Sequence, residues 1–130
     1  MQIDFSSIED PEDFCSVPEG VYACRVADVR AGTTREGAPK WSLRLEVLDG
    51  DFAGRTAAWD NLVWSERGLP RARHVLGSLG FEVQGPIELE PNDLIDRHCR
   101  VQVVPEERED PRTGRRAVRP RVPYLGYDAA

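Results

Sequence analysis

A mainly β fold, a five-stranded barrel with one α-helix between its third and fourth strands, is predicted by three features of the sequence. Segments in which apolar and polar residues alternate mark the strands, because successive side chains of a strand point to opposite faces. One stretch with helical spacing of apolar residues interrupts them after the third strand. Two prolines in the last strand place that strand at an edge or make it irregular.

The first two strands show the clearest alternation. In GVYACRVADVR, which starts at Gly20, one face is formed by Tyr22, Cys24 and Val26. A loop built around Gly37 and Pro39 follows. In KWSLRLEVL, the apolar face comprises Trp41, Leu43, Leu45 and Val47, and the polar face comprises Lys40, Ser42, Arg44 and Glu46. We therefore expect the second strand to bury one face and to expose the other.

The third strand, RTAAWDNLVW, is rich in aromatic and β-branched residues and follows a turn signal at residues 49–50. The helix comes next. We expect Ser65 to cap it, Pro70 to lie in its first turn and Gly80 to end it. Its apolar stripe is formed by Leu69, Ala72, Leu76 and Leu79. This stripe needs a sheet or a barrel mouth to cover.

The last part of the chain predicts two more strands. Residues 91–94 form one short turn, and the fourth strand carries Cys99, Val101 and Val103 on one face. The chain reverses in EDPRTGR, and the last strand is AVRPRVPYLGY. Three strands, one helix and two strands is the order of the OB fold, a five-stranded, partly open Greek-key barrel. An SH3-like barrel, which lacks this helix, and a β-sandwich with a helical insertion are the alternatives.

Charge divides the chain into an acidic N-terminal leader, residues 1–19, and a barrel domain, residues 20–130. The leader holds six acidic residues and no Lys or Arg, whereas the whole chain of 130 residues carries a formal charge of -6. It lacks the basic and apolar regions of a signal peptide, and no apolar run reaches the roughly 18 residues of a membrane span. We therefore expect a cytoplasmic protein.

Catalytic and metal-binding motifs are absent from the sequence. The glycines form neither a phosphate-binding loop nor a dinucleotide-binding motif, and His74 and His98 stand beside no nucleophile motif. The three cysteines (Cys15, Cys24 and Cys99) are odd in number and widely spaced, which favours reduced thiols over disulfides or zinc ligands. We expect a protein that is not an enzyme and that has no catalytic residues, no metal and no cofactor.

Several segments resemble a phage-borne family of small uncharacterised proteins. The most specific part of the pattern is WSLRLEVLDGDFAGRTAAWDNLVWSE, preceded by Gly20, Tyr22 and the loop around Gly37. The helix ending in LG and the later DLIDRHCRVQV fit the same pattern, so the resemblance covers residues 17–125. It implies an OB-like fold and a role among phage replication and recombination functions, in the handling of single-stranded DNA.

Binding of single-stranded DNA needs aromatic planes for the bases and positive charge for the phosphates. OB domains usually place this surface on strands two and three, flanked by the loop after strand one and the loop between strands four and five. The candidate nucleic-acid-binding residues are Arg35, Lys40, Arg44, Arg55, Trp59, Trp64, Arg112, Arg115 and Arg116. Trp59 and Trp64 fall on opposite faces of one strand, so only one of them is expected to be free to stack.

A second function is left open by the charge pattern. Acidic residues at 106, 107, 109 and 110 stand beside the arginines of the last hairpin and can neutralise them, and charged residues also protect an edge strand from pairing. The alternative is a protein–protein adaptor that uses the acidic leader or a sheet edge as its contact. For the DNA-binding hypothesis, the leader is the expected contact for replication or recombination proteins. A homodimer through an unpaired strand edge is compatible with either hypothesis.

Overall fold

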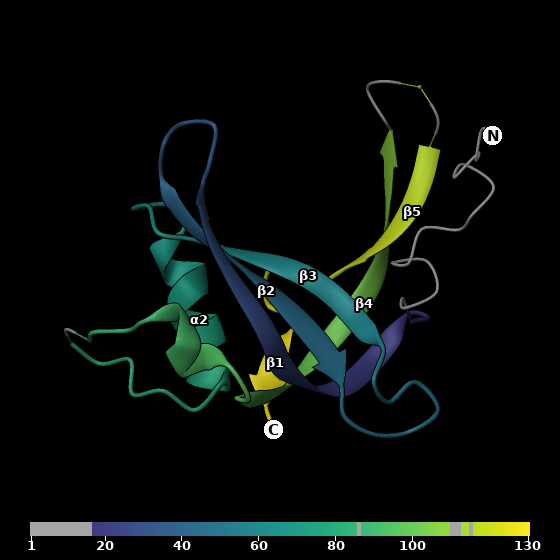
Figure 1. Ribbon diagram of the computed structural model, residues 1–130, viewed down its shortest axis with the longest axis horizontal. Coiled ribbons are helices and arrows are strands. Elements are labelled where there is room, and N and C mark those ends of the chain that lie inside the picture. Colours follow the sequence, from purple (N-terminus) through teal and green to yellow (C-terminus); the bar gives the residue numbers. More distant parts are fainter. Residues whose placement is uncertain (1–16, 86, 110–112, 115) are drawn as a thin grey trace, which may run out of the picture.

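The computed structural model describes residues 17–130 except 86, 110–112 and 115, and its core is an antiparallel sheet. The sheet order is β3-β2-β1-β4-β5, and a sixth strand, β6, pairs with β4 (Figure 1). The elements are β1 (Gly20–Thr33), β2 (Pro39–Val47), β3 (Thr56–Val63), α2 (Leu69–Ser78), a 3-10 helix (Pro91–Leu94), β4 (His98–Glu109), β5 (Arg116–Arg121) and β6 (Tyr127–Ala129). The predicted mainly β fold and the position of the helix between the third and fourth strands are confirmed.

The sheet is open, which corrects the prediction of a barrel. β3 and β5, the two outer strands of the order, come into contact but form no hydrogen-bonded ladder in the described residues. The segment predicted as one last strand is divided into β5 and β6 by a turn at residues 122–126, so that the described part of the chain has six strands. Pro123, which lies in this turn, explains the division, because proline donates no ladder hydrogen bond.

β1 is long and belongs to two halves of the sheet. Its residues from Gly20 to Arg25 pair with β4, and those from Cys24 to Thr33 pair with β2. The register with β2 shifts between Val26 and Asp28, which marks a β-bulge. A bulge bends a strand and increases its twist, so the two halves of the sheet turn relative to one another.

The core lies between the inner face of the sheet and α2. As predicted, β2 buries Leu43, Leu45 and Val47, and Trp41 packs against the same cluster. The helix contributes Ala72, Val75, Leu76 and Leu79, whereas Leu69, predicted on the stripe, is 52% exposed. The predicted stripe is therefore wrong at its first position, since the buried face of the helix begins at Ala72.

A glycine lies at each end of α2. Gly68 is the N-cap, and Ser65 instead accepts a hydrogen bond of 3.1 Å from the Gly68 N–H in the turn before the helix. The N-cap is therefore three residues later than the predicted Ser65, because residues 65–68 form a turn before the helix begins. Gly80 follows the helix with a φ of 94°, as expected for a left-handed residue at a helix end.

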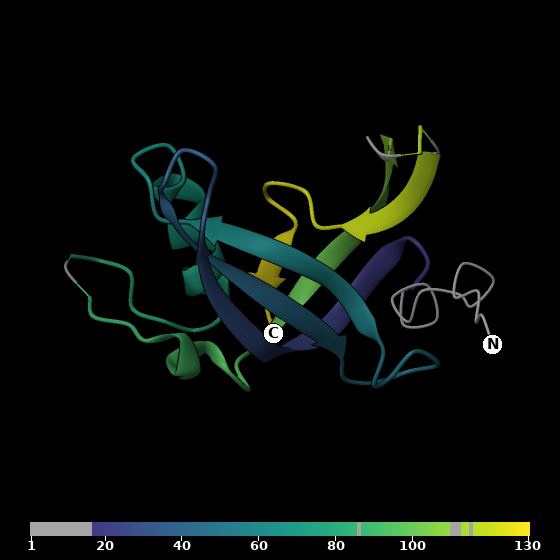
Figure 2. The same cartoon turned by 45° about the horizontal axis from the view of Figure 1, so that its top comes forward.

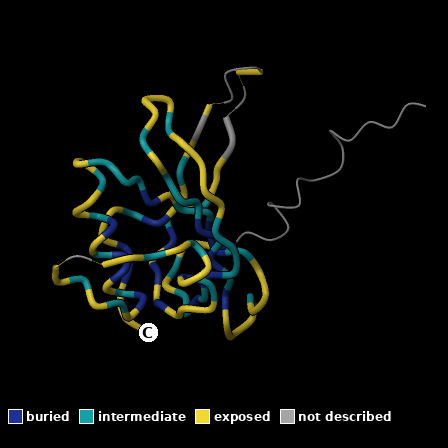
Figure 3. Tube along the Cα trace, turned by 60° about the vertical axis from the view of Figure 1, so that its left-hand side comes forward, coloured by how far each residue is buried: buried dark blue, intermediate teal, exposed yellow. Residues whose placement is uncertain are grey.

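Two hairpins project from the same side of the molecule. The connection of β1 to β2 and the outer parts of β4 and β5 both rise above the sheet, with β3 between their bases in Figures 1 and 2. Figure 3 shows the β1–β2 hairpin as exposed or partly buried along its length, with the buried residues gathered in the body below. β5 is an edge strand, as predicted from its proline.

Cys24 and Cys99 are buried core residues, as predicted. They are direct neighbours across β1 and β4, fully buried and not joined by a disulfide. Burial raises the pKa of each thiol to about 12. Cys15 and the rest of the leader up to residue 16 lie outside the described residues. The described helices include none that is long and apolar enough to cross a membrane.

Candidate nucleic-acid interface

The outer side of β1, β2 and β3 carries a polar surface, which we call the polar face. Its rows are set by the register: Asp28, Arg44 and Trp59 lie side by side across the three strands, and Arg30, Ser42 and Asn61 form the next row. The hydroxyl of Ser42 donates a hydrogen bond of 2.6 Å to the Asn61 side-chain oxygen. The polar face comprises Arg25, Asp28, Arg30, Lys40, Ser42, Arg44, Glu46, Trp59 and Asn61.

Trp59 is the aromatic residue of the polar face. It lies opposite Arg44, and the guanidinium of Arg30 reaches across β2 to within 4.8 Å of its ring centroid. Arg30 also forms an ion pair with Asp28, whose carboxylate lies 3.2 Å from its Nε. A guanidinium over an indole ring is a favourable cation–π pair. The Arg30 side chain remains 71% exposed, so the pair faces solvent.

Trp64 lies apart from Trp59, on the core side of the sheet. Its ring packs edge-on against Trp41, with centroids 4.9 Å apart and planes at 76°. Its Nε1 is buried and finds no hydrogen-bond partner among the described residues. The structure thus separates the two tryptophans as their spacing predicts, and it shows that Trp59 is the one on the outer face.

Charge on the polar face is mixed. Arg25 forms ion pairs with two carboxylates, those of Glu46 and Asp96. Arg44 lies 3.6 Å from Glu46 and donates to the Thr56 hydroxyl, and within the described part of the chain Lys40 forms no hydrogen bond or ion pair. Four cations thus share the face with two carboxylates, and Asp96 lies at its border.

The loop arginines are separated by the length of β2. Arg35 is exposed in the β1–β2 loop, next to the end of β2 that carries Lys40. Arg55 is exposed at the other end, in the β2–β3 loop, where its guanidinium lies 5.4 Å from the Phe52 ring centroid. Arg35 therefore extends the part of the polar face near Lys40, whereas Arg55 stands at the opposite end.

The arginines of the β4–β5 hairpin are only partly placed. Arg112 and Arg115 lie outside the described residues. The backbone of Arg116 begins β5 and is opposite Glu109, and Arg119 is opposite Glu106. Acidic residues therefore face basic ones across this hairpin, as the sequence suggests.

Two features of the site were not predicted. Arg30 lies in a strand with no motif around it, and only the register of β1 against β2 and β3 brings it to Trp59. The second feature is a cluster on the inner side of β3: Asp60 receives hydrogen bonds from Arg71 (2.8 Å) and from the Tyr127 hydroxyl (2.7 Å). Burial, and then the nearby Asp60 carboxylate, raises the pKa of Tyr127 well above its ordinary value. The sequence signal for this cluster was Asp60 itself, because aspartate is rare in the middle of a strand.

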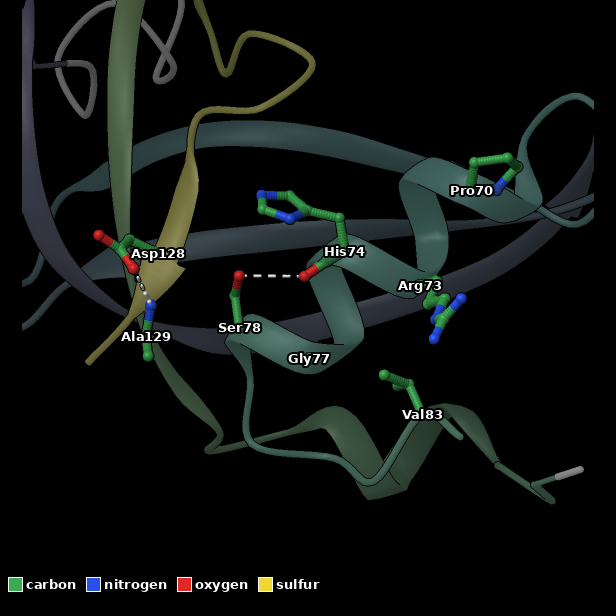
Figure 4. Close-up of a pocket in the computed structure, with 8 residues that line it drawn as sticks. All are labelled: Pro70, Arg73, His74, Gly77, Ser78, Val83, Asp128 and Ala129. Carbon is green, nitrogen blue, oxygen red and sulfur yellow. Dashed lines mark hydrogen bonds between the residues drawn. The ribbon is translucent and has the colours of Figure 1, made fainter. Parts of the chain in front are cut away.

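A shallow groove of about 410 Å³ lies between α2, the segment around Val83 and β6 (Figure 4). His74 and Ser78 from α2 and Asp128 from β6 are among the residues that line it. Each is bonded to backbone: the Ser78 hydroxyl donates to the His74 carbonyl, the His74 ring lies 3.1 Å from the Tyr127 carbonyl oxygen, and Asp128 accepts from the Ala129 N–H. The described residues contain no cluster of His, Cys, Asp or Glu suited to a metal ion.

Comparison with known proteins gives one family match. Residues 1–79 match the model of the family described as Protein of unknown function (DUF669). The matched span covers the predicted leader, β1 to β3, α2 and its C-cap Leu79, so it includes Trp59 and the whole polar face. No curated protein matches the chain.

Proposed function

The chain belongs to the DUF669 family, and we propose that it binds single-stranded DNA on the polar face, without enzymatic activity. The observation that carries the proposal is the pair of Trp59 and Arg30, which offers an aromatic plane and a guanidinium plane to solvent in the middle of a cationic strand surface.

Stacking supplies the base contact. A base stacked on an aromatic side chain contributes roughly 1–3 kcal/mol, and it does so for any base sequence, because every base has a π-face. Arginine also stacks on bases and binds phosphate. We propose that a base packs against the Arg30–Trp59 pair, with the guanidinium between ring and base or displaced toward a neighbouring phosphate.

Phosphate contacts come from the cations around this pair. Lys40 and Arg44 lie on the same face of β2, and Arg35 extends the cationic surface into the β1–β2 loop. The total charge of -6 does not oppose this arrangement, since binding follows the local potential within about one Debye length, ~8–10 Å.

The fold supports the same surface. We interpret the open sheet as an OB-like barrel that is not closed between β3 and β5, since the strand order and the place of the helix are those of an OB domain. OB domains bind oligonucleotides on strands two and three, between the two loops that correspond here to the hairpins of Figures 1 and 3. The proposed role in phage replication or recombination rests on the resemblance of the sequence to the phage-borne family. We also propose that Arg112, Arg115 and Arg116 of the β4–β5 hairpin belong to the interface.

Fluorescence anisotropy of a labelled single-stranded oligonucleotide tests the proposal. The wild-type protein is expected to bind a strand of about 30 bases with micromolar or tighter affinity, to bind duplex more weakly and to lose affinity as salt rises, because phosphate contacts release counterions. Trp59→Ala is expected to lower the affinity roughly tenfold. Lys40→Ala is expected to lower the affinity and to make it less dependent on salt, and Arg73→Ala, on α2 at the opposite side of the sheet, is its matched control. Absence of binding at low salt would overturn the proposal.

A protein–protein adaptor is the second candidate, favoured by the acidic residues that face Arg116 and Arg119 across the β4–β5 hairpin. Deletion of residues 1–16, the part of the leader that precedes the buried Val17, separates the two. An adaptor that uses the leader loses its partner, whereas a DNA-binding protein keeps its affinity or gains some as negative charge is removed.

A further inference from the structure

We propose that Tyr124 is a second base-stacking residue, held beside the outer edge of β3 by Arg71; this inference rests on the proposed binding of single-stranded DNA. Tyr124 belongs to the turn between β5 and β6, and it is 55% exposed. Leu125, next to it, is 69% exposed.

The turn is fixed although its side chains face solvent. The Gly126 N–H donates to the Pro123 carbonyl at 2.9 Å, and the Gly126 carbonyl accepts from the Gln102 N–H of β4 at 2.8 Å. A Cβ at Gly126 would lie 2.8 Å from Pro123 Cδ, so the turn closes tightly on itself. Val122, the first residue of the turn, and Tyr127, directly after it, are buried. The Tyr124 backbone is therefore anchored to the sheet through its own turn.

Arg71 joins this turn to β3. Its Nε donates to the Tyr124 carbonyl at 3.3 Å, and its Nη1 donates to the Asn61 carbonyl at 3.1 Å. The same guanidinium lies 5.9 Å from the Tyr124 ring centroid. One side chain thus brings Tyr124 next to the strand whose Asn61 side chain lies on the polar face, two residues after Trp59.

The charge of Arg71 is already used inside the protein. Its Nη2 lies 2.8 Å from the Asp60 carboxylate, and the side chain is only 15% exposed. Arg71 is therefore a positioning residue, and the exposed element of the cluster is the Tyr124 ring. The nucleic acid that occupies Trp59 and runs along β3 past Asn61 reaches Tyr124 next, and an exposed ring on a fixed backbone loses little freedom when a base stacks on it.

Affinity measured against strand length tests the inference. Oligo-dT strands of increasing length are titrated into the wild-type protein, Tyr124→Ala, Tyr124→Phe and Leu125→Ala. For the longest strands, Tyr124→Ala is expected to lower the affinity roughly tenfold, without a change in the salt dependence, because a stack involves no counterion release. For the shortest strands that still bind, the loss is expected to vanish. Tyr124→Phe, which keeps the ring, is expected to bind as the wild type does.

Leu125→Ala is the matched control, because it removes an exposed apolar side chain from the same turn. A loss of affinity in Leu125→Ala equal to that in Tyr124→Ala would overturn stacking in favour of a general apolar contact. Unchanged affinity of Tyr124→Ala at every length, while Trp59→Ala binds weakly, would overturn this inference alone and would leave the turn as a surface for a protein partner. Absence of binding by the wild type would overturn the proposed function itself.

Discussion

The guanidinium of Arg71 lies 2.8 Å from the carboxylate of Asp60, and the two side chains are only 15% and 13% exposed. Tyr127 donates to the same carboxylate from β6. Three elements distant in the sequence (β3, α2 and β6) are therefore joined by one acceptor. An ion pair with so little solvent around it depends on both partners, since either charge alone in this position is poorly hydrated.

Removal of the cation is expected to destabilise the fold. Arg71→Met keeps much of the side-chain volume but leaves the Asp60 carboxylate without its cation, with the Tyr127 hydroxyl and the Asn61 N–H as its donors. We expect a loss of about 3 kcal/mol in the free energy of unfolding. Urea unfolding followed by circular dichroism measures it. Arg73→Met changes an exposed arginine on the same helix and is expected to have an effect below about 0.5 kcal/mol. Equal effects of the two substitutions would show that the ion pair between Arg71 and Asp60 adds nothing to the free energy of unfolding.

Two glycines of the helix region are expected to respond to alanine in opposite directions. A Cβ at Gly68 would lie 2.2 Å from the Val63 carbonyl oxygen, so Gly68→Ala forces β3 and the helix start apart and is expected to cost about 1–3 kcal/mol. A Cβ at Gly77 meets only Val83 Cγ2, at 3.7 Å, and Gly77→Ala is expected to stabilise the helix by about 0.5–1 kcal/mol. Thermal unfolding of the two variants gives the signs, and a stabilised Gly68→Ala would contradict the close approach.

The sequence predicted the parts of the fold that depend on local pattern. The alternation in β2, the burial of Cys24 and Cys99 and the place of the helix follow from periods of two and 3.6 residues, and the structure confirms them. Closure of the sheet does not follow from such patterns, because it depends on how β3 and β5 approach one another. The separate strand β6 was missed for a similar reason, since its pairing with β4 is set by the tight turn that precedes it.

The candidate site was predicted in its residue types more than in its arrangement. Lys40, Arg44 and Trp59 share a face because of strand alternation, which the sequence displays. The approach of Arg30 to Trp59 crosses an intervening strand, and it depends on a register that includes the bulge between Val26 and Asp28. The role of Arg71 at the Tyr124 turn depends on contacts 53 residues apart in the chain. No local pattern carries information on either contact.

Alkaline pH is expected to destabilise the protein through its buried thiols. Cys24 and Cys99 are neutral when protonated, and their pKa values are raised from 9.0 to about 12 in the folded state. The unfolded chain therefore loses these protons first. The stability they contribute is complete below pH 9 and is lost as the pH rises toward about 12. The raised pKa of Tyr127 acts in the same direction above pH 10.

Urea unfolding at about pH 8 and about pH 10.5 measures this loss, which approaches 1.4 kcal/mol per pH unit for each thiol. The double variant Cys24→Ala, Cys99→Ala is expected to be less stable at the lower pH but to show a flatter dependence on pH. Tyr127→Phe serves as a separate comparison, because it removes the phenol and leaves both thiols. A pH dependence that is identical in the wild type and the double variant would contradict the assignment to the thiols.

Arg30 is expected to contribute to DNA binding by both its charge and its plane, and lysine separates the two. Arg30→Lys keeps a cation near Asp28 but loses the flat guanidinium over Trp59, so affinity for single-stranded DNA is expected to fall several-fold while the slope of log affinity against log salt stays as in the wild type. Arg30→Ala removes the charge as well, and its slope is expected to decrease by about one. Both are measured by anisotropy over a range of salt concentrations, with Arg73→Ala on the opposite side of the sheet as the control. If Arg30→Lys binds as tightly as the wild type, the guanidinium is only a point charge on this surface, and Trp59 stacks bases without it.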